Sequence, residues 1–136
     1  MPFFADSDQL YAVAGTLLTR VQKEEPEATA GISNSRLVIR LETSEPTTEF
    51  TLNGRQRPVE ITCGPSRLRP TLDIELAADT LHRILLGEQS MKKALASGLL
   101  KVQGPVWRVT ALADLFQRGQ MVYPEVLQEQ GLSPNQ

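Results

Sequence analysis

Residues 72–116 read LDIELAADTLHRILLGEQSMKKALASGLLKVQGPVWRVTALADLF. Apolar residues alternate with polar ones at 72–76 and again at 99–103, the period of a half-buried strand. Between these two segments lie residues that start and end short helices, in the order Asp79, Gly87, Ser90 and Gly98. A long apolar segment follows from Val106. This stretch therefore predicts a strand, two short helices, a second strand and a final helix.

The final helix is expected to begin at Gly104-Pro105, since proline is favoured in the first helical turn, and to end at Gly119. At about 100° per residue, one side carries Val106, Val109, Leu112, Ala113 and Phe116. The roughly opposite side carries Trp107, Ala111 and Leu115. A helix this apolar must bury a second face, which could meet more of the same protein, a partner subunit or an apolar ligand. Periodicity does not choose among these three.

The first half of the chain predicts one helix followed by strands. Asp6 or Ser7 can cap a helix whose apolar residues recur at helical spacing over 10–21, and Pro26 ends it. The period then changes to two, which predicts strands at 37–42, 48–52 and 59–63. Asn53-Gly54 predicts a type I′ turn between the second and third strands, because both central positions of that turn need positive φ.

The alternation in the strands also predicts how the layers are arranged. One face of the sheet should be wet, so the helices should all cover the other face. Gly64-Pro65-Ser66 is expected to turn the chain into the fourth strand and complete a meander. The two helices between the fourth and fifth strands give a link long enough for a parallel crossover. The predicted fold class is α+β, with a five-stranded mixed, mostly antiparallel sheet and helices covering one face.

Length and charge limit the classes of protein that the chain can represent. We expect 136 residues to form a single domain, 1–136, with a frayed tail at 132–136. A net charge of −2 from interspersed acids and bases argues against a nucleic-acid partner. One cysteine excludes an internal disulfide. No secretory signal and no apolar run of about 18 residues are present, so the expected location is cytoplasmic.

The residues of chemical interest do not form an active-site pattern. His82, the sole histidine, has no partnered nucleophile in the sequence and is interpreted as an exposed or satisfied helix residue. Cys63 lies at the inward phase of its strand and is interpreted as a small core residue. No His or Cys pair has metal-ligand spacing, and no glycine-rich phosphate loop follows a strand. We therefore expect no catalytic residues, no metal and no cofactor.

Basic residues in two neighbouring loops suggest contact with an anion. The candidates for a lipid head group or a membrane surface are Arg55, Arg57, Arg67 and Arg69. Lys92 and Lys93, at the start of a short helix, are candidates for brief membrane docking. Isolated charges in loops are more often simply solvated, and that reading stays open for all six.

The order of these elements resembles the sterol carrier protein 2 family of lipid-binding domains. In that family an alternating strand leads to an acid-capped helix, a short helix, the motif Ser-Gly-x-Leu-x-Val/Ile-x-Gly and an apolar final helix. The matching motif residues are Ser97, Gly98, Leu100, Val102 and Gly104. Pro105 departs from the acidic residue or Asn of many members, and the C-terminus lacks the peroxisomal tripeptide of many eukaryotic ones. The resemblance is to a stand-alone, bacterial-type member.

The resemblance implies an apolar tunnel between sheet and helices that accepts a fatty acid, acyl-CoA or sterol. Removing an acyl chain from water stabilises the complex by about 0.8 kcal/mol per CH₂, so such a tunnel binds without catalytic groups. The residues expected to line it are Leu17, Val21, Phe50, Ile61, Leu85, Trp107, Leu112, Leu115 and Phe116. Each could instead be ordinary core, and Trp107 is the strongest single candidate because its ring is costly to leave exposed.

The expected function is therefore non-enzymatic binding and transfer of an apolar lipid by a monomer or weak homodimer, with transient membrane contact. The alternative is an accessory subunit that presents lipid intermediates to enzymes of quinone or lipid biosynthesis. An enzymatic role would require a hydrolase on another chain, as in the alkylsulfatase relatives of this fold.

Overall fold

The computed structural model describes residues 2–133, so the last residues of the predicted tail, 134–136, lie outside the described part. The helical elements are α1 (Ser7–Glu24), η1 (Pro26–Thr29), α2 (Ala30–Asn34), α3 (Ala78–Leu85), α4 (Met91–Ala96), η2 (Val106–Leu112) and α5 (Ala113–Glu129), where η marks a 3₁₀ helix. The strands are β1 (Val38–Ser44), β2 (Thr48–Asn53), β3 (Glu60–Cys63), β4 (Leu72–Ala77) and β5 (Lys101–Gln103). Together they confirm the predicted α+β fold with a mixed five-stranded sheet.

The order of the strands differs from the predicted meander. The sheet runs β3-β2-β1-β4-β5, with β1 and β4 parallel and the other pairs antiparallel. After β3 the chain crosses to the far side of β1, where Thr71 N donates to Val38 O at 2.7 Å. The predicted parallel crossover between the fourth and fifth strands is also wrong, because α3 and α4 return the chain to the end of the sheet where β4 finishes.

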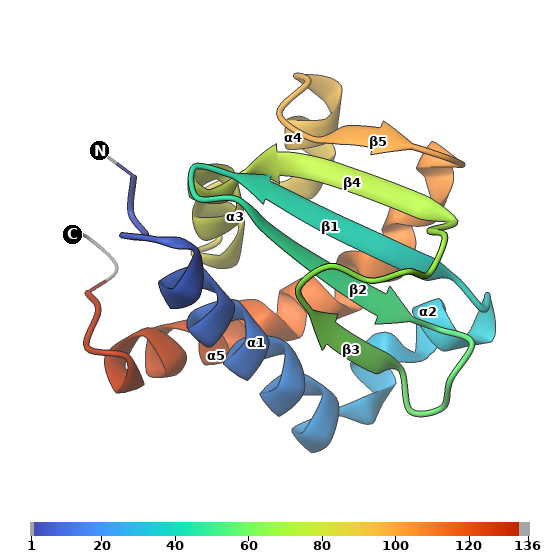
Figure 1. Ribbon diagram of the computed structural model, residues 1–136, viewed down its shortest axis with the longest axis horizontal. Coiled ribbons are helices and arrows are strands. Elements are labelled where there is room, and N and C mark those ends of the chain that lie inside the picture. The colour runs from blue at the N-terminus through green and yellow to red at the C-terminus, as the bar shows by residue number, and fades with distance from the viewer. Residues whose placement is uncertain (1, 134–136) are drawn as a thin grey trace.

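The helices lie on one face of the sheet, as predicted. Figure 1 shows α1 and α5 side by side on this face, and the two helices are in contact. The inward side chains of β1, β2 and β4 are buried, among them Ile39, Phe50 and Ile74. The outer face is polar, and there Arg40 forms ion pairs with Glu42 and Asp73. No helix within residues 2–133 has both the length and the apolar character needed to cross a bilayer.

The predicted helix starts are partly confirmed. Asp6 caps α1 by accepting from Gln9 N at 2.8 Å, and the Ser90 hydroxyl caps α4. Asp79 does not cap α3, because the helix begins earlier, with Ala77 at the cap position. The Asp79 carboxylate accepts instead from Phe3 N at 2.9 Å, which fixes the N-terminal segment against α3.

The final helical region runs longer than predicted and begins differently. Residues 106–112 are a 3₁₀ helix, and the α-helix begins only at Ala113. Gly119 does not end it but lies buried in its interior, where a Cβ atom would be 3.5 Å from Leu85 and 3.6 Å from Leu17. The helix α5 continues through Pro124 to Glu129.

The predicted type I′ turn at Asn53-Gly54 is not formed, because six residues separate β2 from β3 and Gly54 does not have positive φ. Gly54 is required for a different reason. Its N–H donates to Leu37 O at 2.6 Å, and a Cβ atom would lie 2.4 Å from Ile32 O. The glycine therefore allows β2 to approach the backbone between α2 and β1.

Candidate functional site

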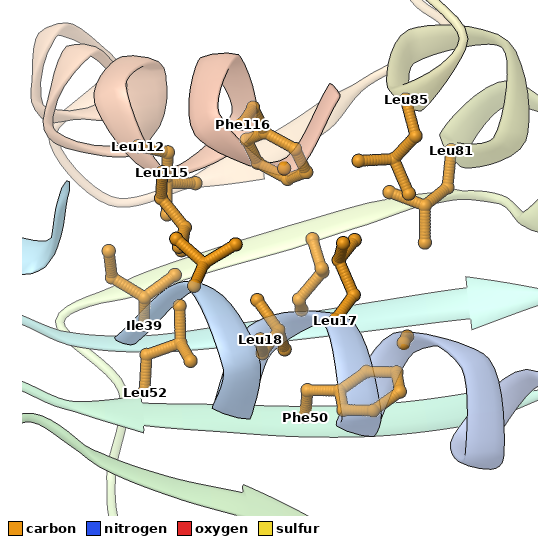
Figure 2. Close-up of a pocket in the computed structure, with 14 residues that line it drawn as sticks. Leu17, Leu18, Ile39, Phe50, Leu52, Leu81, Leu85, Leu112, Leu115 and Phe116 are labelled. Atoms are coloured by element: carbon orange, nitrogen blue, oxygen red, sulfur yellow. The ribbon is translucent and has the colours of Figure 1, made fainter. Parts of the chain in front are cut away.

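An apolar pocket lies between the inner face of the sheet and the helices α1, α3, η2 and α5 (Figure 2). The sheet supplies two cross-strand pairs, Ile39 with Leu52 and Leu41 with Phe50. The helices supply side chains at helical spacing, which places them on one stripe facing the sheet. These are Ala14, Leu17, Leu18, Val21, Leu81, Leu85, Leu112, Leu115, Phe116 and Gly119. No lining residue carries a polar side chain, so the site can recognise only apolar surface.

The pocket is almost closed in this structure. Its free space for a water-sized sphere is about 20 Å³. About 10–15 Å³ of such space holds one water molecule, whereas an engineered cavity of about 150 Å³ is needed to bind benzene. The open tunnel expected for an alkyl chain is therefore not present in this conformation, and a ligand must displace lining side chains to enter.

Most of the predicted site residues meet at this pocket. Those in the lining are Leu17, Val21, Phe50, Leu85, Leu112, Leu115 and Phe116. Ile61 is not among them, because β3 is at the edge of the sheet and its partner Leu52 takes the inner position. The lining residues that the sequence reasoning did not select, such as Ile39 and Leu81, follow the same periodicity and could have been found by it.

Trp107, the strongest sequence candidate, lies outside the pocket. Its side chain is 66% exposed, and the Arg108 guanidinium sits 4.0 Å from the centre of its ring. Trp107 lies in the 3₁₀ helix η2, whose side with Val109 and Leu112 is buried and whose opposite side, with Trp107, is exposed. The α-helical period assumed for the sequence placed Trp107 on a face that this segment does not bury.

The candidate arginines do not all lie together. Arg55 and Arg57 lie in the loop between β2 and β3, and Arg69 precedes β4 at the same end of the sheet. Arg67 is farther away, because the neighbouring Ser66 N–H donates to the Glu49 carboxylate near the start of β2.

Cys63 is exposed, not a core residue. It ends the edge strand β3, where the sheet has no further strand to cover it. Its Sγ atom lies against α1 at Gly15, and this partial burial raises the pKa of the thiol. A raised pKa disfavours the reactive thiolate.

His82 is buried and hydrogen-bonded, as expected for a satisfied helix residue. Its Nδ1 atom and the Tyr123 hydroxyl are 2.6 Å apart, and its ring stacks on Phe3 with centroids 3.6 Å apart. The two residues join α3 to α5 at the end of the pocket region, and the stacked Phe3 joins the N-terminal segment to them. The arrangement is structural, because it holds three segments of the chain in place.

Burial of Tyr123 predicts a loss of stability in alkali. Burial raises the pKa of the Tyr123 phenol, so the folded state holds the phenol proton more tightly than the unfolded state does. In the unfolded chain the phenol loses its proton at about pH 10. The stabilisation is complete below that pH and is lost as pH rises above it. The free energy of unfolding of Tyr123→Phe should fall less steeply as the pH rises into the alkaline range. At neutral pH the loss of the hydrogen bond to His82 should lower it by about 1–2 kcal/mol.

Denaturant unfolding followed by circular dichroism across the alkaline range measures this effect. Tyr11→Phe is the matched control, because the Tyr11 hydroxyl also takes part in a hydrogen bond, accepting from Glu49 N, while its ring is only half-buried. If the free energy of unfolding falls equally steeply with alkaline pH in Tyr123→Phe and in the unmodified protein, the burial of this phenol is contradicted.

The chain thus forms a sheet with helices on one face and a wholly apolar pocket between the two layers. Residues 15–117 match the sequence model of the SCP-2 sterol transfer family, and the chain belongs to that family. No curated protein sequence matches the chain.

Solved structures share the fold at low sequence identity. Sterol Carrier Protein 2 from Yarrowia lipolytica, in its apo form, is 16% identical with a TM-score of 0.62, over 88% of this chain and 98% of that one. Palmitated SCP2L2 from Aedes aegypti is 13% identical with a TM-score of 0.59, over 79% and 93%. A UbiJ-SCP2 ubiquinone synthesis protein is 24% identical with a TM-score of 0.58, over 89% and 97%.

Proposed function

We propose that this chain, acting as one cytoplasmic domain, binds an apolar lipid in the pocket and transfers it without catalysing a reaction. The observation that carries the proposal is the lining, which is formed entirely by apolar side chains from both layers. Such a surface offers an acyl chain about 0.8 kcal/mol per buried CH₂ and gives no group that could act as an acid, base or nucleophile. The palmitated state of the Aedes aegypti protein supports a fatty acid as the ligand.

Entry of the lipid must separate the layers that the apo structure packs together. About 20 Å³ of free space means that the lining side chains of α3 and α5 have to move away from the sheet. The binding free energy is then the gain from burying the chain minus the cost of this rearrangement. We propose that the ligand-free protein is the closed state and that the lipid itself fills the space between the layers.

Titration with the fluorescent fatty acid cis-parinaric acid tests this function. We expect saturable binding to one site in the micromolar range, reversed by added palmitate. Trp107 emission should change little, because that ring is exposed and outside the lining. Binding that does not saturate, or that palmitate does not reverse, would contradict the proposal.

The second candidate is an accessory subunit that presents lipid intermediates to biosynthetic enzymes, which the likeness in fold to UbiJ-SCP2 favours. The two differ in assembly. A carrier should be a monomer or weak homodimer by light scattering, whereas an accessory subunit should co-purify with its enzymes in fixed ratio from its own host.

A further inference from the structure

Loops from distant parts of the sequence converge at one end of the sheet. The register pairs the start of β1 with the end of β2, at Val38 and Asn53, and with the start of β4. The end of β5 lies beside the same end of β4. The segments that precede β1 and β4 and follow β2 and β5 are therefore neighbours, on the right in Figure 1.

These segments carry a concentration of positive charge. We call this surface the arginine end, formed by Arg36, Arg55, Arg57, Arg69, Val106, Trp107 and Arg108. Four of its arginines are exposed, and Arg108 is half-exposed. Within residues 2–133, none of the five forms an ion pair, whereas Arg20, Arg40 and Arg118 elsewhere all do. Glu60, at the start of β3, is an acidic residue on this side.

Two apolar side chains project from the same surface. Trp107 is 66% exposed and Val106 is 45% exposed. The Trp107 ring is held in place by Arg108, whose guanidinium covers it at 4.0 Å and donates to Ser35 Oγ at 3.0 Å. A fixed, exposed tryptophan beside arginines is suited to the boundary between lipid head groups and acyl chains.

We propose that the arginine end docks the protein on an anionic lipid bilayer, with the arginines on head-group phosphates and Trp107 and Val106 in the interfacial layer. The outer sheet face is less suited to such a surface, because its acids Glu42, Asp73 and Glu75 outnumber its bases Arg40 and Lys101. The five arginines thus give this end a local positive charge, although the net charge of the chain is −2. A lipid bilayer fits better than nucleic acid because apolar side chains interrupt the basic surface.

Docking on a bilayer would bring the pocket close to the lipid, so its role rests on the lipid transfer proposed above. The observations that support docking are the exposed arginines and Trp107, which do not belong to the pocket. Trp107 is the only tryptophan in the chain, so its emission reports on docking directly. With phosphatidylcholine vesicles that contain phosphatidylglycerol, at low ionic strength, we expect the emission to shift to the blue and the protein to sediment with the vesicles. Pure phosphatidylcholine vesicles and molar salt should abolish both effects, since salt screens surface charge.

Arg55→Gln with Arg69→Gln removes two charges from the arginine end. Each basic residue near an anionic bilayer contributes about fivefold in affinity, so this double variant should bind vesicles about 25-fold more weakly. Arg83→Gln with Lys101→Gln is the matched control, because it removes two exposed charges from α3 and β5 at the other end of the sheet, where β4 finishes. The control should bind vesicles like the unmodified protein, and both double variants should keep the unmodified circular dichroism spectrum.

Equal loss of vesicle binding in the control variant and in the Arg55/Arg69 variant, or equal affinity for vesicles and for single-stranded DNA, would overturn the docking surface. Palmitate-reversible cis-parinaric acid binding is measured in parallel, without vesicles. Intact fatty-acid binding with no vesicle binding overturns the docking alone, whereas vesicle binding without fatty-acid binding overturns the transfer function alone. We expect the arginine variant to retain fatty-acid affinity, because neither residue lines the pocket.

Discussion

Gly54→Ala should lower the free energy of unfolding by about 3 kcal/mol, as expected when a rigid part of a core is overpacked. The added Cβ would lie 2.4 Å from Ile32 O and 2.5 Å from Leu37 O. Both are backbone atoms, so no side-chain rotation can relieve the contact. The hydrogen bond from Gly54 N to Leu37 O, at 2.6 Å, would lengthen or break as the two segments separate.

Gly31→Ala in the adjacent helix α2 provides the control. Its nearest contact would be 3.4 Å, to Ala111 O, which is ordinary van der Waals distance. Alanine favours a helix over glycine by up to about 1 kcal/mol, so this variant should be neutral or slightly more stable. Urea unfolding followed by circular dichroism measures both variants. A Gly54→Ala protein as stable as Gly31→Ala would show that β2 and α2 do not approach this closely.

Leu85→Ala should destabilise the protein by about 3 kcal/mol and yet tighten fatty-acid binding. Leu85 lines the pocket from α3 and is almost fully buried. Its removal leaves a cavity where the acyl chain would otherwise have to displace a side chain, so part of the rearrangement cost disappears. We expect affinity for cis-parinaric acid to rise about tenfold, equivalent to about 1.4 kcal/mol.

Leu127→Ala tests whether the gain is specific to the pocket. Leu127 is also fully buried, in α5, but does not line the pocket. Its truncation should destabilise the protein to a similar degree and leave the dissociation constant unchanged. Saturating palmitate should raise the melting temperature of Leu85→Ala more than that of Leu127→Ala, because a ligand stabilises in proportion to its affinity for the folded state. The same affinity change in both variants would place the ligand elsewhere.

The elements of the fold followed from local patterns, but their arrangement did not. Alternation identified each strand and the inward face of β1, β2 and β4, as for Ile39 and Ile74, but not that of the edge strand β3, where Cys63 is exposed. It carried no information on which strands pair, so the segment after Cys63 was assigned to a meander although it crosses to the far side of β1. Gly54 was recognised as essential for the wrong reason, because the close approach of a distant backbone cannot be read from neighbouring residues.

The sequence predicted most of the residues that line the pocket, but it did not predict how little free space the pocket has. Apolar periodicity selects buried residues such as Leu17 and Phe116, and most of the selected residues meet at one place. It cannot measure the space between them, which depends on how closely the helices approach the sheet. Trp107 was misplaced because the second apolar side of residues 106–112 was expected to be buried, whereas only the side with Val109 and Leu112 is covered.

A substitution of Gly119 by alanine would change the stability and the flexibility of this protein in opposite directions. An alanine there would make only ordinary contacts with Leu85 and Leu17 and would strengthen α5, by up to about 1 kcal/mol. The methyl group would also fill space beside Leu85 and Leu17, where the proposed entry of a lipid requires the helix to move away from the sheet. Selection for heat resistance alone would therefore favour that change and yield a more rigid protein that admits the proposed lipid less readily.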